Sequence, residues 1–340
     1  MGRRAAALAA AAGATAVAAA ACSPSLEPGA NEGDVFHLAL NQTETHPSYI
    51  ALDRWGEHLA EQTGGRWTID IYPNETLGAQ AEALQLVSDG SVELAIVSGP
   101  QLENLNRDFI ALNLPTTFDD IDHQMRVVHD MAVVGELYSS LEETNNITVL
   151  GGFTQGERSV YTAFGPVSSP ADLAGQKLRV QESELNIAMA QALGASATPM
   201  AYGELYTGLQ AGVVDAAENN EVSYASQRHF EVAPHWSYTR HQVGLDYLVV
   251  NSDVLASMTE ADRAVFAEGW ELARATHVEL WRAATEEAVI TAEEGGATFH
   301  EVDASVFREA LEPLAERFLT TETQWEIYDG ARAASTEPSG

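Results

Sequence analysis

Residues 175–181 read GQKLRVQ, and residues 199–220 read PMAYGELYTGLQAGVVDAAENN. The first segment places Arg179 inside a short apolar strand pattern, and the second ends a further strand pattern with Glu218 and Asn219. The chain has only 17 lysine and arginine residues against 50 acidic residues, so an arginine among apolar neighbours requires an explanation. A guanidinium in such surroundings is stable only if it is paired or if it binds an external anion.

Predicted strands and helices alternate through the first third of the chain. Helical patterns near 49–59 and 79–89 separate three strand patterns at 35–40, 67–71 and 92–97. Apolar residues recur at three- and four-residue spacing in the first helical pattern and at alternate positions in the second strand pattern. This order is typical of βαβ units and predicts an α/β fold with a parallel sheet that has helices on both faces.

The longest helical pattern begins at Thr259 and is ended by two glycines at 295–296. Thr259 and Asp262 resemble a capping box, and an apolar stripe follows on one face of the helix. Such a helix would be about 50 Å long, which is too long for one lobe. We therefore predict that it spans two lobes. A last helix is expected at 305–319, and a disordered tail at 331–340.

A short internal repeat also favours two lobes. Residues 90–95 (GSVELA) match residues 212–217 (GVVDAA), and each copy follows a helical pattern and opens a strand. Equivalent turns in two lobes would bring the ends of both strands, Ser98 and Asn219, to one shared cleft. Open α/β sheets bind their ligands at such strand ends.

Three segments resemble the solute-binding subunits of TRAP transporters, the C4-dicarboxylate-binding type family, which capture organic acids outside the membrane. They are the GxR segment that ends at Arg158, the KLRV segment around Arg179, and the Glu-Asn pair that ends at Asn219. The resemblance covers most of the chain after about residue 34. It implies a two-lobe, periplasmic-binding-protein-like α/β fold of type II style, with a long helix across both lobes.

The same resemblance implies how a ligand is bound. Arg179 would form a bidentate pair with the ligand carboxylate, for which a planar guanidinium is better suited than a lysine. Arg158 and Asn219 would complete this clamp. The alternative for Arg158 is an internal ion pair with a nearby acid such as Glu157 or Glu182.

Further binding residues follow from the resemblance, each with a structural alternative. Tyr202 would lie against the ligand or pack in the core. Asn41, Gln80 and Ser98 would lie near the far end of the ligand, or act as cap and turn residues.

Two residues of a later segment complete the predicted site. His241 occupies a position that the family uses, although its neighbour Arg240 could equally form a surface ion pair. Asp246, if it points inward, would accept hydrogen bonds from ligand hydroxyl groups. Together with the Glu-Asn-Asn run at 218–220, Asp246 favours a hydroxylated acid such as a uronate. A simple dicarboxylate is the alternative ligand.

By resemblance, the chain also exchanges segments between its lobes. Lobe I would comprise residues 34–156 and 245–284, and lobe II would comprise residues 157–244 and 285–330. The family implies delivery of the bound acid to membrane-embedded permease subunits, and a monomer is the default expectation. An extracytoplasmic sensor module on the same fold is an alternative that sequence does not separate from transport.

The first residues have the features of a secretory signal. Arg3 and Arg4 precede an apolar run at 5–20, which is too short to span a bilayer comfortably. Cys22 is the only cysteine and lies where a lipoprotein signal peptidase would leave it as the first residue. We expect a signal peptide at 1–21, lipid attachment at Cys22 and a flexible tether at 22–33. An ordinary cleaved signal is the alternative.

The composition excludes several other classes. A formal net charge of −33 excludes nucleic-acid binding, which requires cationic patches. No G-x-S-x-G elbow, phosphate-binding loop or helical pair of metal-ligating histidines occurs. We therefore expect no catalytic activity, no cofactor and no metal, and contact with the membrane only through the lipid anchor. An exported hydrolase that uses a carboxylate pair is the remaining enzymatic alternative.

Overall fold

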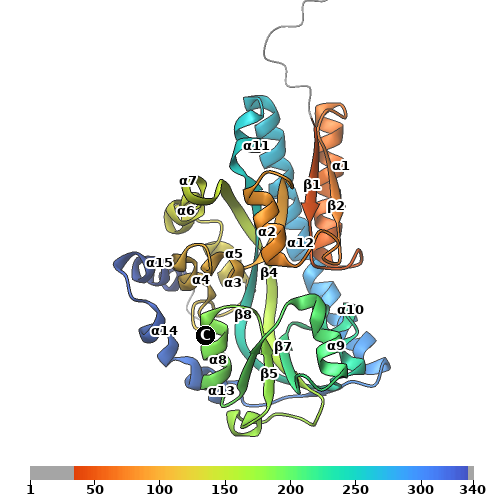
Figure 1. Ribbon diagram of the computed structural model, residues 1–340, viewed down its shortest axis with the longest axis vertical. Helices are drawn as coiled ribbons and strands as arrows, with labels where there is room; N and C mark the ends of the chain where they lie inside the picture. Colours follow the sequence, from red (N-terminus) through yellow and green to blue (C-terminus); the bar gives the residue numbers. More distant parts are fainter. Residues whose placement is uncertain (1–33, 336–340) are drawn as a thin grey trace, which may run out of the picture. The chain divides into compact units, whose positions relative to one another are not determined.

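The computed structural model describes residues 34–335, and these residues form one compact unit. The signal peptide, Cys22 and the tether that the sequence predicts lie outside the described residues. Nine strands form one mixed sheet in the order β2-β1-β3-β8-β4-β7-β5-β6, with β9 paired to β8 (Figure 1). The strands are β1 (Val35–Ala39), β2 (Thr68–Tyr72), β3 (Leu94–Ser98), β4 (Ile147–Thr162), β5 (Lys177–Val180), β6 (Ser196–Pro199), β7 (Ala216–Asn219), β8 (His235–Asn251) and β9 (Thr298–His300).

Helices cover the sheet and connect its strands. The α-helices are α1 (Pro47–Thr63), α2 (Gln80–Ser88), α3 (Gly99–Glu103), α4 (Ile110–Asn113), α5 (Ile121–Val127), α6 (Met131–Ser139), α7 (Glu142–Asn145), α8 (Glu184–Ala192), α9 (Leu205–Gln210), α10 (Glu221–Ser226), α11 (Ser252–Ser257), α12 (Glu260–Glu294), α13 (Ala304–Leu311), α14 (Pro313–Phe318) and α15 (Glu322–Ala333). Short 3-10 helices are η1 (Arg107–Phe109), η2 (Pro170–Leu173), η3 (Tyr202–Glu204) and η4 (His229–Glu231).

The sheet consists of two parallel groups joined by a central antiparallel pair. β1 pairs in parallel with β2 and β3, and β5 pairs in parallel with β6 and β7, as expected of βαβ units. The long strands β4 and β8 pair antiparallel with each other and connect the two groups through β7 and β3 (Figure 1). This arrangement confirms the predicted two-lobe α/β fold.

Bulges interrupt the pairing of β4 with β8. The register shifts between Thr154 and Glu157 and again between Arg158 and Val160. Gly156 lies in the first shift with a φ of 65°, and a Cβ there would approach Trp281 Nε1 to 2.7 Å. Bulges redirect side chains at sheet edges and binding sites. Gln155 lies in the same shift as Gly156, and Arg158 borders the next shift. Both side chains belong to the site described below.

Helix α12 spans both lobes, as the sequence predicts. Thr259 is its N-cap and accepts a hydrogen bond from the backbone N–H of Asp262. Phe266 and Trp270 join the core around β1 and α1, whereas Ala292, near the other end of α12, joins the core around α10 and β7. The helix therefore buries its stripe against two separate cores, which explains its length.

The structure corrects three details of the sequence prediction. Val213 is exposed in a turn, so the strand that ends at Asn219 begins only at Ala216. The helix expected at 305–319 is divided into α13 and α14 at Pro313, which opens α14. Helix α15 continues to Ala333, so the predicted disordered tail is wrong for residues 331–333.

No helix within residues 34–335 combines the length and the apolar character needed to cross a membrane.

The internal repeat is also reproduced in the fold. Gly90 and Gly212 both have positive φ values, and each lies in the turn between a helix and the strand that follows. Ser98 and Asn219 accordingly end β3 and β7.

Candidate functional site

Arg179 is the most deeply buried arginine that has incomplete hydrogen bonding. It lies on β5 with 2% of its surface exposed. Its Nε and Nη2 both donate to the carbonyl oxygen of Met200, at 3.0 and 2.7 Å, while Nη1 is buried without a partner among the described residues. Burial lowers the pKa of Arg179. A lowered pKa means that the surrounding protein does not fully compensate the charge.

A narrow cavity adjoins the Arg179 side chain. Its volume is about 10 Å³, and its lining includes Glu75, Gln80, Gln101 and Tyr202 in addition to Arg179. Residues from β5, from α2 and from the loop before α2 thus meet at one point, although they lie about a hundred positions apart in the chain. The cavity is too small for an organic acid, so the two sides must separate for a ligand to enter.

Tyr202, which the sequence predicts to lie against the ligand or in the core, lies against the Arg179 guanidinium. The Arg179 Cζ atom is 5.9 Å from the centre of the Tyr202 ring, within the range of a cation–π contact. The hydroxyl group of Tyr202 donates to the carbonyl oxygen of Ser223 at 3.5 Å, and burial raises the pKa of Tyr202 to about 12. The ring therefore remains neutral at physiological pH and is available to pack against a ligand.

Gln80, Ser98 and Asp246 form a hydrogen-bonded chain beside this cavity. Gln80 Oε1 accepts from the Ser98 backbone N–H at 2.6 Å, and Ser98 Oγ donates to Asp246 Oδ1 at 2.8 Å. Gln155 Nε2 also donates to Asp246 Oδ1. Burial raises the pKa of Asp246, while its hydrogen bonds from Gln155 and Ser98 oppose that shift. Asp246 does point inward, but Oδ1 is occupied by protein donors.

Arg158 is paired within the protein. Its Nε and Nη2 donate to the two carboxylate oxygens of Glu218, at 2.5 and 2.8 Å. Burial alone would raise the pKa of Glu218, but Arg158 and His241 together more than offset this effect and lower the pKa to about 2. The ion-pair alternative for Arg158 is therefore realised, with Glu218 in place of the expected Glu157 or Glu182.

Asn219 joins the same polar cluster. Its Oδ1 accepts from Arg158 Nη1 at 3.1 Å and from the backbone N–H of Asn220 at 2.9 Å. Gln155 Oε1 accepts from the same Nη1, so Gln155 connects the Arg158 cluster to Asp246. A continuous hydrogen-bonded network thus runs from Gln80 to Asn219.

Asn41 and His241 lie at the margins of the predicted site. Asn41 follows β1 and lines a second small cavity together with Glu75 and Gln80, and its Oδ1 is buried without a partner within residues 34–335. His241 lies behind Glu218, with Nε2 3.7 Å from Glu218 Oε2 and Nδ1 2.8 Å from Thr239 Oγ1. His241 does not line the cavity at Arg179.

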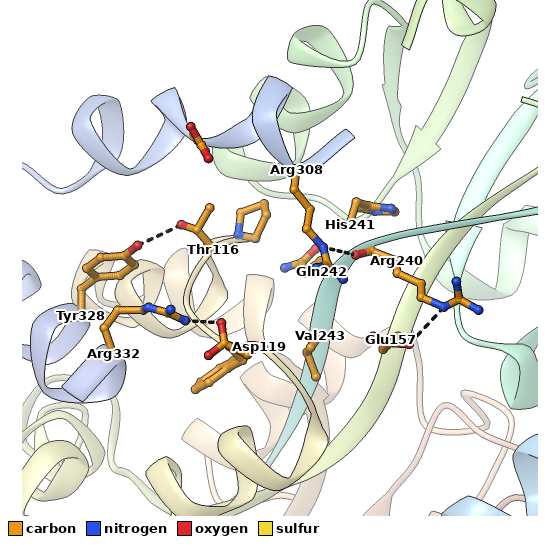
Figure 2. Close-up of a pocket in the computed structure, with 13 residues that line it drawn as sticks. Thr116, Asp119, Glu157, Arg240, His241, Gln242, Val243, Arg308, Tyr328 and Arg332 are labelled. Carbon is orange, nitrogen blue, oxygen red and sulfur yellow. Dashed lines mark hydrogen bonds and ion pairs between the residues drawn. The ribbon is translucent and has the colours of Figure 1, made fainter. Parts of the chain in front are cut away.

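A larger cavity of about 360 Å³ lies on the other side of His241. Figure 2 shows that Arg240 of β8, Arg308 of α13 and Arg332 of α15 surround it. Each of these arginines has an acceptor in the protein: Arg240 binds Glu301, Arg332 binds Asp119, and Arg308 donates to the carbonyl oxygen of Arg240. Arg240 and Arg332 are paired with carboxylates, and Arg308 is exposed to solvent. The buried guanidinium of Arg179 is therefore the better candidate for binding an anion out of water.

Sequence reasoning missed two important residues of the site. Glu75 lines both small cavities, whereas the sequence analysis selects Gln80, five residues later at the start of α2. Gln155 joins the two halves of the polar network. The position of Glu75 just beyond the carboxyl end of β2 was a signal, since ligands bind there in α/β sheets. The role of Gln155 depends on a bulge that the sequence does not reveal.

The chain matches the model of the bacterial extracellular solute-binding proteins of family 7 over residues 38–322. It is 32% identical over 280 residues to a solute-binding protein of Chromohalobacter salexigens, which covers 81% of this chain and 82% of that protein. The crystal structure of a TRAP periplasmic solute-binding protein from Anaerococcus prevotii with bound D-glucuronate has a TM-score of 0.85 and 34% identity, and covers 88% of this chain and 97% of that one. The crystal structure of a TRAP periplasmic solute-binding protein from Xanthobacter autotrophicus with bound β-D-galacturonate has a TM-score of 0.83 and 28% identity. The match covers 88% of this chain and 100% of that one.

Proposed function

The chain belongs to family 7 of the bacterial extracellular solute-binding proteins and is the solute-binding component of a TRAP transporter, and we propose that its ligand is a hexuronate or a related sugar acid. The carboxylate of this acid pairs with Arg179, and the closed protein delivers it to the permease subunits in the membrane. The protein itself performs no chemical step on the ligand.

The observation that carries this proposal is the unpartnered Nη1 atom of Arg179. A buried donor without an acceptor costs about 1–3 kcal/mol, and more when the group is charged. A ligand carboxylate at this position would remove that cost and form a charge-assisted hydrogen bond. The uronates bound by the two similar crystal structures carry such a carboxylate together with several hydroxyl groups.

Binding in this proposal is coupled to the opening of a cleft. We assign residues 34–156 and 245–284 to one lobe and residues 157–244 and 285–330 to the other. Hydrogen bonds that then cross the cleft include Gly203 N to Glu75 Oε2 at 3.1 Å, Asn104 Nδ2 to the carbonyl oxygen of Glu182 at 3.0 Å, and Arg107 Nη1 to Glu184 Oε2 at 2.8 Å. Opening breaks these contacts, and a ligand that bonds to both sides favours the closed state.

We further propose that Cys22 carries a lipid that anchors the protein at the outer face of the membrane. This part of the proposal depends on the sequence alone. Replacement of Cys22 by serine should release the protein from the membrane fraction of expressing cells, while ligand binding stays unchanged. Retention of the C22S protein in that fraction would contradict lipid attachment.

The test of the ligand class is a thermal-shift screen followed by calorimetric titration. D-Glucuronate and D-galacturonate are compared with succinate and malate. A ligand present at a hundredfold its dissociation constant stabilises the folded protein by about 2.7 kcal/mol, which is readily measured as a rise in melting temperature. We expect the uronates to raise the melting temperature without being consumed.

Arg179→Ala should abolish this shift. The matched control is Arg282→Ala, because Arg282 is exposed on α12 and pairs with Asp122, and neither residue lines the cavity. Full uronate affinity in the Arg179→Ala protein would contradict the proposal. Turnover of the uronate on incubation would favour an enzyme instead.

A further inference from the structure

Glu75 is held in place by an unusual backbone. Asn74 and Glu75 both have φ values of 55°, in the left-handed region that non-glycine residues rarely adopt. The backbone N–H groups of Asn74 and Glu75 donate to the carbonyl oxygens of Gln42 and Leu40, each at 3.1 Å. Such strained residues persist where the surrounding structure fixes them, and they cluster at ligand sites. These two hydrogen bonds fix the left-handed backbone, and the Glu75 side chain lines the cavity at Arg179.

The carboxylate of Glu75 is only half satisfied. Oε2 accepts from the Gly203 N–H across the cleft at 3.1 Å, whereas Oε1 is buried without a partner among the described residues. Gly203 permits this approach, because a Cβ at that position would lie 2.4 Å from Glu75 Oε2. Burial raises the pKa of Glu75, although the Gly203 N–H and Arg179 oppose the shift.

Glu75 and Arg179 line the same cavity, and each has one buried polar atom without a partner among the described residues. One presents an unpartnered acceptor, Oε1, and the other presents an unpartnered donor, Nη1. A molecule that carries a carboxylate at one end and a hydroxyl group at the other would satisfy both atoms. A second carboxylate would instead meet the negative charge of Glu75, and like charges brought together in a desolvated site are strongly disfavoured.

We propose that Glu75 accepts a hydrogen bond from a ligand hydroxyl group and selects hydroxylated monocarboxylates against dicarboxylates. This inference rests on the proposed function, since it assumes that Arg179 binds the ligand carboxylate. A site built to bond a hydroxyl group discriminates strongly against analogues that lack it, because its own polar atom is then left unpaired.

A purely mechanical role for Glu75 makes a different prediction. If the carboxylate only holds the cleft closed through Gly203, its loss should weaken the binding of every acid by the same factor. If it reads a ligand hydroxyl group, its loss should change the ratio of affinities between acids. The ratio is therefore the decisive readout.

The experiment measures the affinities of D-glucuronate, succinate and cyclohexanecarboxylate by calorimetric titration. Cyclohexanecarboxylate keeps a six-membered ring and the carboxylate but lacks hydroxyl groups. In the Glu75→Gln protein we expect D-glucuronate to bind about tenfold or more weakly and succinate to bind equally well or better. The preference for glucuronate over each of the other acids should therefore fall about tenfold or more.

Two further variants complete the design. Glu204→Gln removes an equal charge from the residue next to Gly203, and it should leave the affinities and their ratio unchanged. Gly203→Ala keeps the charge of Glu75 but displaces its carboxylate, and it should reduce the same preference. Unchanged ratios in Glu75→Gln would overturn the inference while leaving the proposed function intact. A wild-type protein that binds no uronate would overturn both.

Discussion

Arg158 and Glu218, 60 residues apart in the sequence, form a two-pronged ion pair that is almost fully buried. The strand register explains this contact: Val160 of β4 is paired with Glu218 of β7, and Arg158 lies two residues before Val160. Both carboxylate oxygens of Glu218 bind Arg158, so Glu218 does not neutralise Arg179. The Nη1 donor of Arg179 has no partner among the described residues. Arg158 thus contributes to the site by holding Asn219 and Gln155 in position.

Glu218→Gln should destabilise the protein by about 3–5 kcal/mol, because it leaves the buried Arg158 charge uncompensated. Urea unfolding measures this loss. The control is Glu184→Gln, which breaks the exposed pair with Arg107 and should cost less than about 1 kcal/mol. Equal costs for the two variants would show that burial of the Arg158 pair has no energetic consequence.

Arg179→Lys should retain the fold but bind D-glucuronate about tenfold to a hundredfold more weakly. Lysine keeps the positive charge, but it cannot bond to the Met200 carbonyl oxygen and to a carboxylate in the same planar arrangement. Calorimetric titration beside the exposed-site variant Arg282→Lys checks this expectation. A lysine variant with wild-type affinity would mean that charge alone, without fork geometry, binds the ligand.

Gly244→Ala should lower both stability and ligand affinity. A Cβ at this position would lie 2.6 Å from Gln155 Oε1 and 2.9 Å from Arg158 Cδ, so both side chains must move. Overpacking of this kind costs about 1–3 kcal/mol.

The matched variant is Gly135→Ala in α6, where the nearest atom to the new Cβ is Met131 Cε at 3.5 Å. This substitution should stabilise the protein by about 0.5–1 kcal/mol, because alanine is the better helix former. Thermal unfolding and uronate titration of both variants test the pair of expectations. An unaltered uronate affinity in Gly244→Ala would exclude Gln155 and Arg158 from ligand positioning.

Stability should fall on acidification partly through His46. Burial lowers the pKa of His46 to about 3. The unfolded chain therefore takes up a proton near pH 6.5, whereas the folded chain resists protonation down to about pH 3. Because the pKa of His46 is lower in the folded state, the free energy of unfolding is highest above pH 6.5 and decreases as the pH falls below that value.

His46→Asn isolates this contribution. His46 Nδ1 accepts from the Ser48 N–H at the start of α1, and asparagine is also a good N-cap. Between pH 7 and pH 5 the variant should lose about 2 kcal/mol less stability than the wild type, as measured by urea unfolding. The other titrating groups are common to both proteins and cancel in the comparison, except for His277, whose pKa is lowered by burial and by His46. Parallel pH profiles would contradict the assignment.

The sequence determined the features that depend on local pattern. The spacing of apolar residues predicted the strands and helices. The length of the helical pattern at 259–294 indicated two lobes, and the isolated Arg179 indicated that an anion binds there. These inferences succeed because hydrophobic periodicity reports directly which face of an element is buried. The resemblance carried by Arg158, Arg179 and Asn219 then identified the family, which the comparisons confirm.

Only the tertiary structure decided which polar groups meet. Glu218 rather than Glu157 neutralises Arg158 because the β4–β7 register brings it there. Glu75 lines one cavity with Arg179 because a left-handed turn places its carboxylate against the backbone N–H of Gly203. Such contacts depend on register, bulges and loop conformation over separations of 60 to 128 residues, and a one-dimensional pattern of polar residues carries no information about them.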